Sequence, residues 1–593
     1  MLSWGTPPPA RTVLEHGDWS LVVEGDRLEQ VSVSGVHVLR SIRCVVRDRD
    51  WRTFPVRDAA LEVLDDSAHR LAARVSGMAE LDEQRVSFSL ELGLEHGLMR
   101  VALRAEALTP VLRARLGLIV LHPLAEVGTV MTVVHPEGDR STATLGPTIS
   151  PHQPAKNIAA LQWNRAGLDV DLALYGDVFE MEDQRNWIDA SFKTYSTPLS
   201  IPFPVQLAVG DVIEHALELR VRGTAESAVA ESAVARPQLG ADLGHIPAVF
   251  LGATTTPGAV AALPDELASL GVLVEVPFDS PSASAILERA AIEANGTALD
   301  VRLHGIDASN LSSLIARLAA LANRGEVRVA RIGITSDRGQ VTTPEVWAAL
   351  VEAIAASHQP AVELLAGARS HFTEVNRRHA ELPAEAATLG FSLTPQMHDE
   401  ATAQIVESLD VLPGLLADAR RIAGDRALVL GPITLRSRYN TVASTAGPTP
   451  GDPAMTGYGA HLVPDATDAR WQSPAAGVWL LGALQRLARP GVAAIAIGEV
   501  RGPRGVVRDE GTFTAAGEVV KWWAGHEEGV RVDIAHFPQG VHGLAVRMSG
   551  ASESIDLLLG SLREEPVRVE LRDHAGRIHE IDLQPGALAA VTL

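Results

Sequence analysis

Between residues 246 and 501 the chain repeats one pattern, in which a short apolar stretch is followed by a longer stretch rich in Ala and Leu. This alternation is typical of parallel α/β folds, because neighbouring parallel strands need a long crossover connection that is usually a helix. Eight strand-helix units in about 250 residues match the number and size of a TIM barrel. The sequence therefore predicts a (β/α)8 barrel, with strands at 248–251, 272–276, 299–304, 327–334, 361–366, 389–393, 427–430 and 493–497.

The sequence on either side of this region alternates apolar and polar residues over short stretches. Residues 85–92 and 168–174 are examples before the barrel, and residues 543–548 are an example after it. A period of two is typical of strands that bury one face of an antiparallel sheet. We therefore predict a multidomain α/β plus all-β protein, with an N-terminal antiparallel β-sandwich domain (1–235), a central TIM-barrel domain (236–505) and a small C-terminal β-sandwich domain (506–593).

Composition excludes several classes of function. The formal net charge is −22, which disfavours nucleic-acid partners because their affinity comes from clustered Lys and Arg. No stretch approaches the ~20 apolar residues of a membrane helix, and the amino terminus has no secretory-signal pattern. Cys44 is the only cysteine, so no intrachain disulfide can form. We expect a cytoplasmic protein without nucleic-acid or membrane partners; the number of subunits is left open, and a homo-oligomer is compatible with the sequence.

Polar residues gather where the predicted barrel strands end. Reactive groups of TIM barrels lie at these carboxyl ends and in the loops that follow them. The loops after the fifth and sixth strands are the richest, and they place a carboxylate that could serve as a general base beside several hydrogen-bond donors. No His-Glu-x-x-His pair, Gly-rich phosphate loop or Gly-x-Ser-x-Gly elbow is present, so neither a metal nor a cofactor is predicted. The candidate residues are Glu275, His304, Glu374, Asn376, Arg377, Gln396, His398 and Glu499.

Residues 180–195 of the first domain have an unusual composition, EMEDQRNWIDASFKTY. The segment mixes charged, amide and aromatic residues, and large side chains such as Trp187 need a surface to pack against. Because loops on rigid scaffolds often carry function, we predict that it lies over the barrel mouth and contacts a ligand. The alternative is a domain interface fixed by ion pairs. The predicted substrate-binding residues of the segment are Glu180, Asp183, Arg185, Asn186, Lys193 and Tyr195.

The same segment resembles the D-apionate lactonase family of bacterial apiose catabolism. The stretches FTEVNR (372–377) and FSLTPQMH (391–398) are similar to barrel loops of that family, and the three-part layout also matches, so the resemblance covers nearly the whole chain. It implies hydrolysis of a small-molecule sugar lactone, D-apionolactone, to D-apionate in the cytoplasm. It does not by itself identify catalytic residues.

Roles for the residues are therefore predicted from the chemistry of lactone opening. Water attacks an sp² carbonyl carbon, so the site needs a base, donors for the tetrahedral oxyanion and an acid for the leaving alkoxide. We predict Glu374 as the base, with Asn376, Arg377 and His398 stabilising or protonating the oxygens. The substrate hydroxyls are assigned to the polar residues of segment 180–195 and to Glu275, His304, Gln396 and Glu499.

Two other functions are compatible with the pattern. A glycoside hydrolase would use two carboxylates, for which Glu374 and Glu499 are the natural pair. They follow the fifth and eighth strands, whereas the large clan of barrel glycosidases uses the fourth and seventh. A noncatalytic sugar-binding protein would bind tightly without turnover, but the acid-base candidates at the strand ends count against it.

Overall fold

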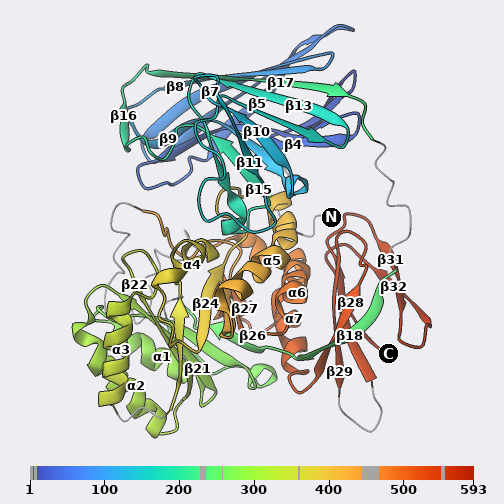
Figure 1. The fold of residues 1–593 in the computed structure, drawn as a ribbon. Coiled ribbons are helices and arrows are strands. Elements are labelled where there is room, and N and C mark those ends of the chain that lie inside the picture. Colours follow the sequence, from blue (N-terminus) through green and yellow to red (C-terminus); the bar gives the residue numbers. More distant parts are fainter. Residues whose placement is uncertain are drawn as a thin grey trace.

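The computed structural model describes residues 4–5, 10–226, 236–256, 258–357, 361–443, 467–548 and 554–593, and Figure 1 shows its three parts. An N-terminal domain of two antiparallel sheets lies against one end of a central barrel, and a C-terminal sheet packs beside the barrel. The predicted fold class is confirmed. Among the helices of the described residues, none combines the length and the apolar composition needed to cross a membrane.

One sheet of the N-terminal domain faces the barrel. Its strand order is β1-β2-β3-β4-β9-β15-β14, with β16 paired to β9. The long strands β4 and β9 form its centre because both are apolar and buried over most of their length. The strands are β1 (Arg11–His16), β2 (Trp19–Glu24), β3 (Arg27–Val33), β4 (Val36–Asp48), β9 (Val111–Pro123), β14 (Glu180–Asp183), β15 (Ser191–Tyr195) and β16 (Val205–Leu207).

The second sheet of this domain covers the other side of the first. Its order is β11-β10-β12-β13-β17-β8-β7-β6-β5, and alternate residues of strands such as β7 are buried, as the sequence pattern predicts. Leu90 of β7 and Leu118 of β9 are both fully buried in the shared core. The strands are β5 (Val56–Asp66), β6 (Leu71–Leu81), β7 (Gln84–Glu95), β8 (Leu98–Ala107), β10 (Val130–Val134), β11 (Arg140–Thr144), β12 (Ala160–Arg165), β13 (Leu168–Tyr175) and β17 (Val212–Gly223).

The barrel has the eight parallel strands that the sequence predicts. It closes through the pairing of β19 with β26, and β27 (Gly505–Val507) adds to β26 outside the ring. Its amino-terminal half is filled by apolar side chains and by Asp300, whose carboxylate binds Arg302 (2.5 Å) and Arg331 (2.9 Å). The strands are β19 (Ala248–Gly252), β20 (Gly271–Pro277), β21 (Ala298–Gly305), β22 (Arg328–Ser336), β23 (Glu363–Gly367), β24 (Thr388–Leu393), β25 (Ala427–Ile433) and β26 (Val492–Arg501).

Helices cover the outside of the barrel. The last of them, α7, begins at the capping residue Thr514 and packs on α6 and β27. The barrel therefore extends beyond the predicted boundary at residue 505, because the apolar face of α7 is buried against it. The helices are α1 (Ala283–Ala294), α2 (Leu311–Asn323), α3 (Pro344–Ala356), α4 (Phe372–Arg378), α5 (Thr402–Ala423), α6 (Pro474–Leu487) and α7 (Ala515–Ala524).

The C-terminal part is a seven-stranded sheet with the order β32-β31-β18-β28-β29-β30-β33. Strand β18 precedes the barrel in sequence but pairs antiparallel with β28. The predicted boundary at residue 236 therefore separates β18 from the sheet to which it belongs. The strands are β18 (Gln238–His245), β28 (Val530–Ala535), β29 (Val541–Met548), β30 (Ser554–Ser561), β31 (Val567–Arg572), β32 (Ile578–Leu583) and β33 (Leu588–Thr592).

Buried polar contacts fix the N-terminal domain on the barrel. Asp399, which follows β24, binds Arg27 (2.5 Å) and lies 3.6 Å from both Arg40 and Arg43 of β4. Although burial opposes ionisation, these guanidinium groups hold the pKa of Asp399 far below its ordinary value. The docking of one sheet face onto the carboxyl end of the barrel creates a cavity between them.

Candidate active site

A cavity of about 1670 Å³ lies between the barrel-facing sheet and the carboxyl ends of the barrel strands. One wall is formed by alternate residues of β4, β9, β15 and β14, because side chains of a strand point to opposite faces in turn. The opposite wall comes from β20, β21 and the segments after β19, β23, β24, β25 and β26. The residues of the sheet wall are Arg43, Val45, Arg47, Arg115, Gly117, Ile119, Glu182, Lys193 and Tyr195.

Segment 180–195 forms part of this wall, and it is more regular than the sequence predicts. Strands β14 and β15 pair antiparallel around the short 3-10 helix Gln184–Trp187. Glu182 and Lys193 are direct partners in this pairing, and their charged groups are 2.6 Å apart. Trp187 donates a hydrogen bond from Nε1 to Glu182 (3.1 Å). The segment therefore places a fixed ion pair and an indole in the cavity.

His398 of the barrel and Asp189 of the N-terminal domain form a buried dyad across the domain interface. The distance from His398 Nδ1 to Asp189 Oδ2 is 2.5 Å, and Asp189 is 1% exposed. A carboxylate only accepts hydrogen bonds, so Nδ1 carries the proton and Nε2 has a free lone pair. Within the described residues Nε2 has no hydrogen-bond partner, and the side chain lines the cavity. This arrangement suits a general base.

The surroundings of His398 keep its imidazole neutral. Burial lowers the pKa of His398, and the nearby charge of Lys193 lowers it further, although Asp189 acts in the opposite direction. Trp187 packs edge-on against the imidazole, with ring centroids 5.7 Å apart. The guanidinium group of Arg377 lies 5.8 Å from the centroid of the same indole. Lys193 thus acts on a neutral base, and Arg377 lies beside the indole that packs on that base.

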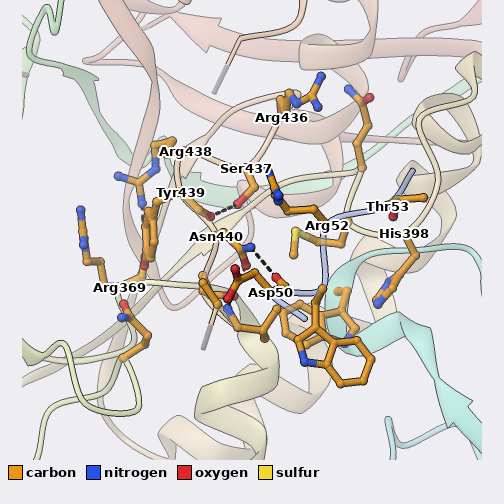
Figure 2. A pocket seen from close by; sticks show the side chains of 18 of the residues that line it. Asp50, Arg52, Thr53, Arg369, His398, Arg436, Ser437, Arg438, Tyr439 and Asn440 are labelled. Atoms are coloured by element: carbon orange, nitrogen blue, oxygen red, sulfur yellow. Dashed lines mark hydrogen bonds between the residues drawn. The ribbon is translucent and has the colours of Figure 1, made fainter. Parts of the chain in front are cut away.

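A second polar cluster lies at another part of the cavity (Figure 2). Glu275 of β20 forms ion pairs with Arg369 (3.3 Å) and Arg438. Although burial raises it, Arg438 and Arg369 together hold the pKa of Glu275 at about 2. The guanidinium of Arg369 lies 4.0 Å from the ring centroid of Tyr439, and His304 lies 3.2 Å from an oxygen of Asp337. These groups offer both donors and acceptors for hydroxyl groups.

A third carboxylate comes from the end of β26. Glu499 is paired with Arg504 (2.5 Å) and accepts a hydrogen bond from Thr255 Oγ1 (2.9 Å). Burial raises the pKa of Glu499, while Arg504 lowers it. In the described part of the chain, no group of three or more His, Cys, Asp or Glu side chains converges in a way that could hold a metal ion.

Eight of the fourteen residues predicted for the site line the cavity. They come from both domains and from several barrel strands, as the strand-end argument requires. Sequence reasoning did not single out Asp189, although it lies within the segment that was singled out, nor the arginines on alternate positions of β4 and β9. The eight residues are Lys193, Tyr195, Glu275, His304, Arg377, Gln396, His398 and Glu499.

The other six predicted residues lie outside the cavity lining. Glu374 of α4 is half-buried, and burial raises its pKa. The Asn376 amide is buried and donates to Asn186 Oδ1 (2.9 Å) across the domain interface. Asp183 and Arg185 form a buried pair of 2.7 Å, and Glu180 accepts from Tyr195. The residues of segment 180–195 that lie outside the lining are therefore held by buried polar contacts, as the alternative of a domain interface predicts.

The pair expected for a glycoside hydrolase is not brought together. Glu499 lines the cavity and Glu374 does not, so these two carboxylates do not face each other across the same space.

Comparison with known proteins identifies the family. Residues 1–224 match the model described as D-apionate lactonase, N-terminal domain, and residues 253–528 match D-apionate lactonase, TIM barrel domain. The chain belongs to the D-apionate lactonase family. A protein of Brucella anthropi named D-apionate lactonase is 26% identical over 538 residues, which are 85% of each chain. The resemblance found in the sequence is thereby confirmed, and the protein is a lactone hydrolase.

Solved structures are similar to parts of this lactonase-family chain at low identity. A putative aldose 1-epimerase from Escherichia coli K12 is 12% identical, with 36% of this chain and 99% of that chain covered and a TM-score of 0.27. A GH30 endoxylanase from Clostridium papyrosolvens is 9% identical, with 60% and 97% covered and a TM-score of 0.36.

Proposed function

We propose that this lactone hydrolase opens D-apionolactone to D-apionate in the cavity between the N-terminal sheet and the barrel. The observation that carries the proposal is the His398–Asp189 dyad, whose free Nε2 lies in the cavity beside Lys193. The substrate is taken from the name of the family and of the Brucella anthropi relative.

His398 acts first as the base. Its Nε2 removes a proton from a water molecule as the water oxygen attacks the lactone carbonyl carbon. The carbonyl π bond breaks, and its electron pair moves to the oxygen of a tetrahedral oxyanion. Asp189 stabilises the imidazolium that forms, because its carboxylate holds the Nδ1 proton at 2.5 Å.

The cations beside the dyad stabilise the oxyanion. Lys193 is fixed by Glu182 at 2.6 Å, and Arg377 is held by a hydrogen bond from Nε to the Pro151 carbonyl (2.9 Å). Fixed charges in a site shielded from bulk water stabilise developing negative charge without reorganising. This assignment keeps the predicted role of Arg377 and gives Lys193 an electrostatic role in place of a grip on hydroxyls.

Collapse of the oxyanion completes the reaction. The carbonyl re-forms as the ring C–O bond breaks, and the imidazolium of His398 gives its proton to the leaving alkoxide. The product is an open hydroxy acid, and His398 returns to its neutral form. The cluster of Glu275, Arg369 and His304 contacts the hydroxyl groups of the sugar, since it combines acceptors and donors on the barrel side of the cavity.

Acid release from a panel of substrates tests this proposal. Purified protein is incubated with D-apionolactone, other aldonolactones and chromogenic glycosides, and the protons released are titrated at constant pH. We expect turnover of D-apionolactone and no glycoside cleavage. His398→Gln should lower kcat by about 10²- to 10⁴-fold, the usual contribution of a positioned base.

His379→Gln is the matched control, because His379 is exposed just after α4 and lies outside the cavity. Full turnover by a folded His398→Gln protein would refute the assigned base. Glycoside cleavage without lactone hydrolysis would refute the substrate class.

A further inference from the structure

Two arginines of the cavity wall form no ion pair with any of the described residues. Arg47 of β4 and Arg115 of β9 are directly opposite each other in the strand pairing, and both line the cavity. Within the described residues, neither has a carboxylate oxygen within 4.0 Å of its guanidinium group. Arg52 and Arg504 of the cavity differ, since Arg52 pairs with Asp48 and Arg504 pairs with Glu499.

The hydrogen bonds of the two guanidinium groups leave many donors unused. Arg47 donates from Nη1 to the Trp51 carbonyl (2.9 Å). Arg115 donates to the carbonyls of Ala114 (2.6 Å) and Pro198 (3.0 Å), while its buried Nε has no partner. A guanidinium group has five N–H donors, so among the described residues most of those on Arg47, and two on the terminal nitrogens of Arg115, make no hydrogen bond.

Burial of these charges is unfavourable unless an anion accompanies them. Arg115 is 5% exposed, and burial lowers the pKa of both Arg47 and Arg115. Water can satisfy the N–H donors, but it cannot neutralise the charges. The carboxylates that act on the pKa of Arg115 have other partners, because Glu180 accepts from Tyr195 and Asp177 accepts from Thr197.

The whole cavity favours negative ligands although the chain carries a net charge of −22. Its lining has ten arginines and one lysine against six acidic residues. Clefts lined by one sign of charge raise the local concentration of ligands of the opposite sign. The sign of this lining therefore points to an anion.

Aromatic rings hold one of the two guanidinium groups in place. The Arg115 guanidinium carbon is 5.2 Å from the ring centroid of Trp51 and 5.2 Å from that of Phe203. The two rings meet edge to face, with centroids 5.1 Å apart. A guanidinium fixed in this way presents its planar edge to an oxyanion, which carboxylate and phosphate groups match with two parallel hydrogen bonds.

Arg47 and Arg115 lie some distance from the His398–Asp189 dyad, and strand β4 connects the two places. Arg43 donates from Nη2 to the carbonyl of His398 (2.9 Å), and Arg47 follows it by four residues in the same strand. Four residues of extended chain span about 13 Å. The cavity of about 1670 Å³ is also larger than the roughly 300–1,000 Å³ of most small-molecule sites, so it has room for a second binding position.

We propose that Arg47 and Arg115, with Trp51 and Phe203, form a binding subsite for the oxyanion of an acidic sugar, either the carboxylate of an aldonate or the phosphate of a sugar phosphate. The subsite is separate from the His398–Asp189 dyad, and the proposal does not depend on the lactonase reaction.

Calorimetric titration of the full chain at low chloride tests the proposal without turnover. The probes are D-gluconate for the carboxylate, glucose 6-phosphate for the phosphate and neutral glucose as the uncharged control. We expect saturable binding of at least one anion, no binding of glucose, and an affinity that falls as sodium chloride is added. The relative affinities of gluconate and glucose 6-phosphate identify which oxyanion the subsite prefers.

Variants locate the binding. Arg47→Gln and Arg115→Gln should each weaken anion binding by about tenfold or more, the effect of losing one charge-assisted hydrogen bond. Arg52→Gln is the matched control, since Arg52 also lines the cavity but is paired with Asp48 and Asp82. If wild-type protein binds neither anion at millimolar concentration, or if Arg47→Gln binds as tightly as wild type, the proposal is refuted. If Arg115→Gln does not fold because the stacked guanidinium is lost, the binding measured with Arg47→Gln still decides the test.

Discussion

Replacing Asp189 by asparagine isolates the contribution of the dyad from that of His398 itself. The carboxylate of Asp189 fixes the imidazole of His398 through a hydrogen bond of 2.5 Å and is 1% exposed. Asparagine has almost the same shape but offers an amide in place of one carboxylate oxygen. An NH2 group facing Nδ1 favours the tautomer in which Nε2 carries the proton, and this tautomer cannot accept a proton from water.

The expected loss can be worked out from that hydrogen bond. A hydrogen bond to a charged group contributes about 1.5–3 kcal/mol, which corresponds to a factor of roughly 10 to 150 in rate if it is fully formed only in the transition state. The change of tautomer adds to this loss. We therefore expect kcat to fall by about 10²- to 10⁴-fold, and KM to change by less than about threefold because Asp189 does not line the cavity.

Initial rates of acid release with D-apionolactone measure this effect, and thermal unfolding reports the structural loss separately. Asp183→Asn is the control, because Asp183 is also 1% exposed, lies in the same segment and forms a buried pair with Arg185. It should lower stability by about 3–5 kcal/mol while the folded protein keeps its kcat. The reasoning is refuted if Asp189→Asn retains kcat within about threefold of wild type, or if both variants lose activity equally.

Two further predictions concern carboxylates. Glu374→Gln should leave kcat/KM within about twofold of wild type, because Glu374 lies outside the cavity lining; a loss of a hundredfold in steady-state assays would restore it as the base. Glu275 has a folded pKa of about 2 against an ordinary value of 4.5, so its ionised form stabilises the fold above pH 4.5 and this contribution is lost as the pH falls toward 2. Urea unfolding between pH 7 and pH 3 should therefore show a shallower loss of stability in Glu275→Gln, by about 2 kcal/mol, and identical pH profiles would contradict this explanation.

The barrel could be predicted from sequence because its signal is local and repeated. Each apolar stretch followed by a helical stretch gives the same information, and eight repeats leave little choice of fold. The domain boundaries were harder to predict from the sequence. Strand β18 is an ordinary polar strand whose partner, β28, lies almost 300 residues away, and no local pattern assigns it to the C-terminal sheet.

Glu374 lies outside the cavity lining, although the sequence places it beside Arg377. The sequence argument treated residues 374–377 as one cluster, whereas α4 turns successive side chains by about 100° around its axis. This rotation separates Asn376, which faces the domain interface, from Arg377, which lines the cavity. Glu374 lies almost one turn before Arg377 along the helix axis and is outside the cavity lining. A strand-end rule gives the correct end of a barrel, but the direction of each side chain depends on the local element.

Segment 180–195 is divided in a similar way by the directions of its side chains. The pairing of β14 with β15 places Glu182 and Lys193 on one face, in the cavity, and Asp183 on the other. A period of two applied to β14 separates Glu182 from Asp183, although it also places Glu180, which lies outside the lining, on the face of Glu182. The arginines of β4 and β9 could not be predicted as site residues from the sequence, because their position in the site depends on which face of the sheet docks on the barrel.

Docking of the two domains and assembly of the dyad depend on the same few residues. His398 comes from the barrel and Asp189 from the N-terminal domain, so neither domain alone holds a complete dyad. The next residue, Asp399, binds Arg27 at 2.5 Å and lies 3.6 Å from Arg43 of the docking sheet. Because these ion pairs flank the dyad in the chain, any shift of the sheet on the barrel also moves His398 relative to Asp189. The polar interface is therefore part of the site: it sets the hydrogen bond on which the base depends.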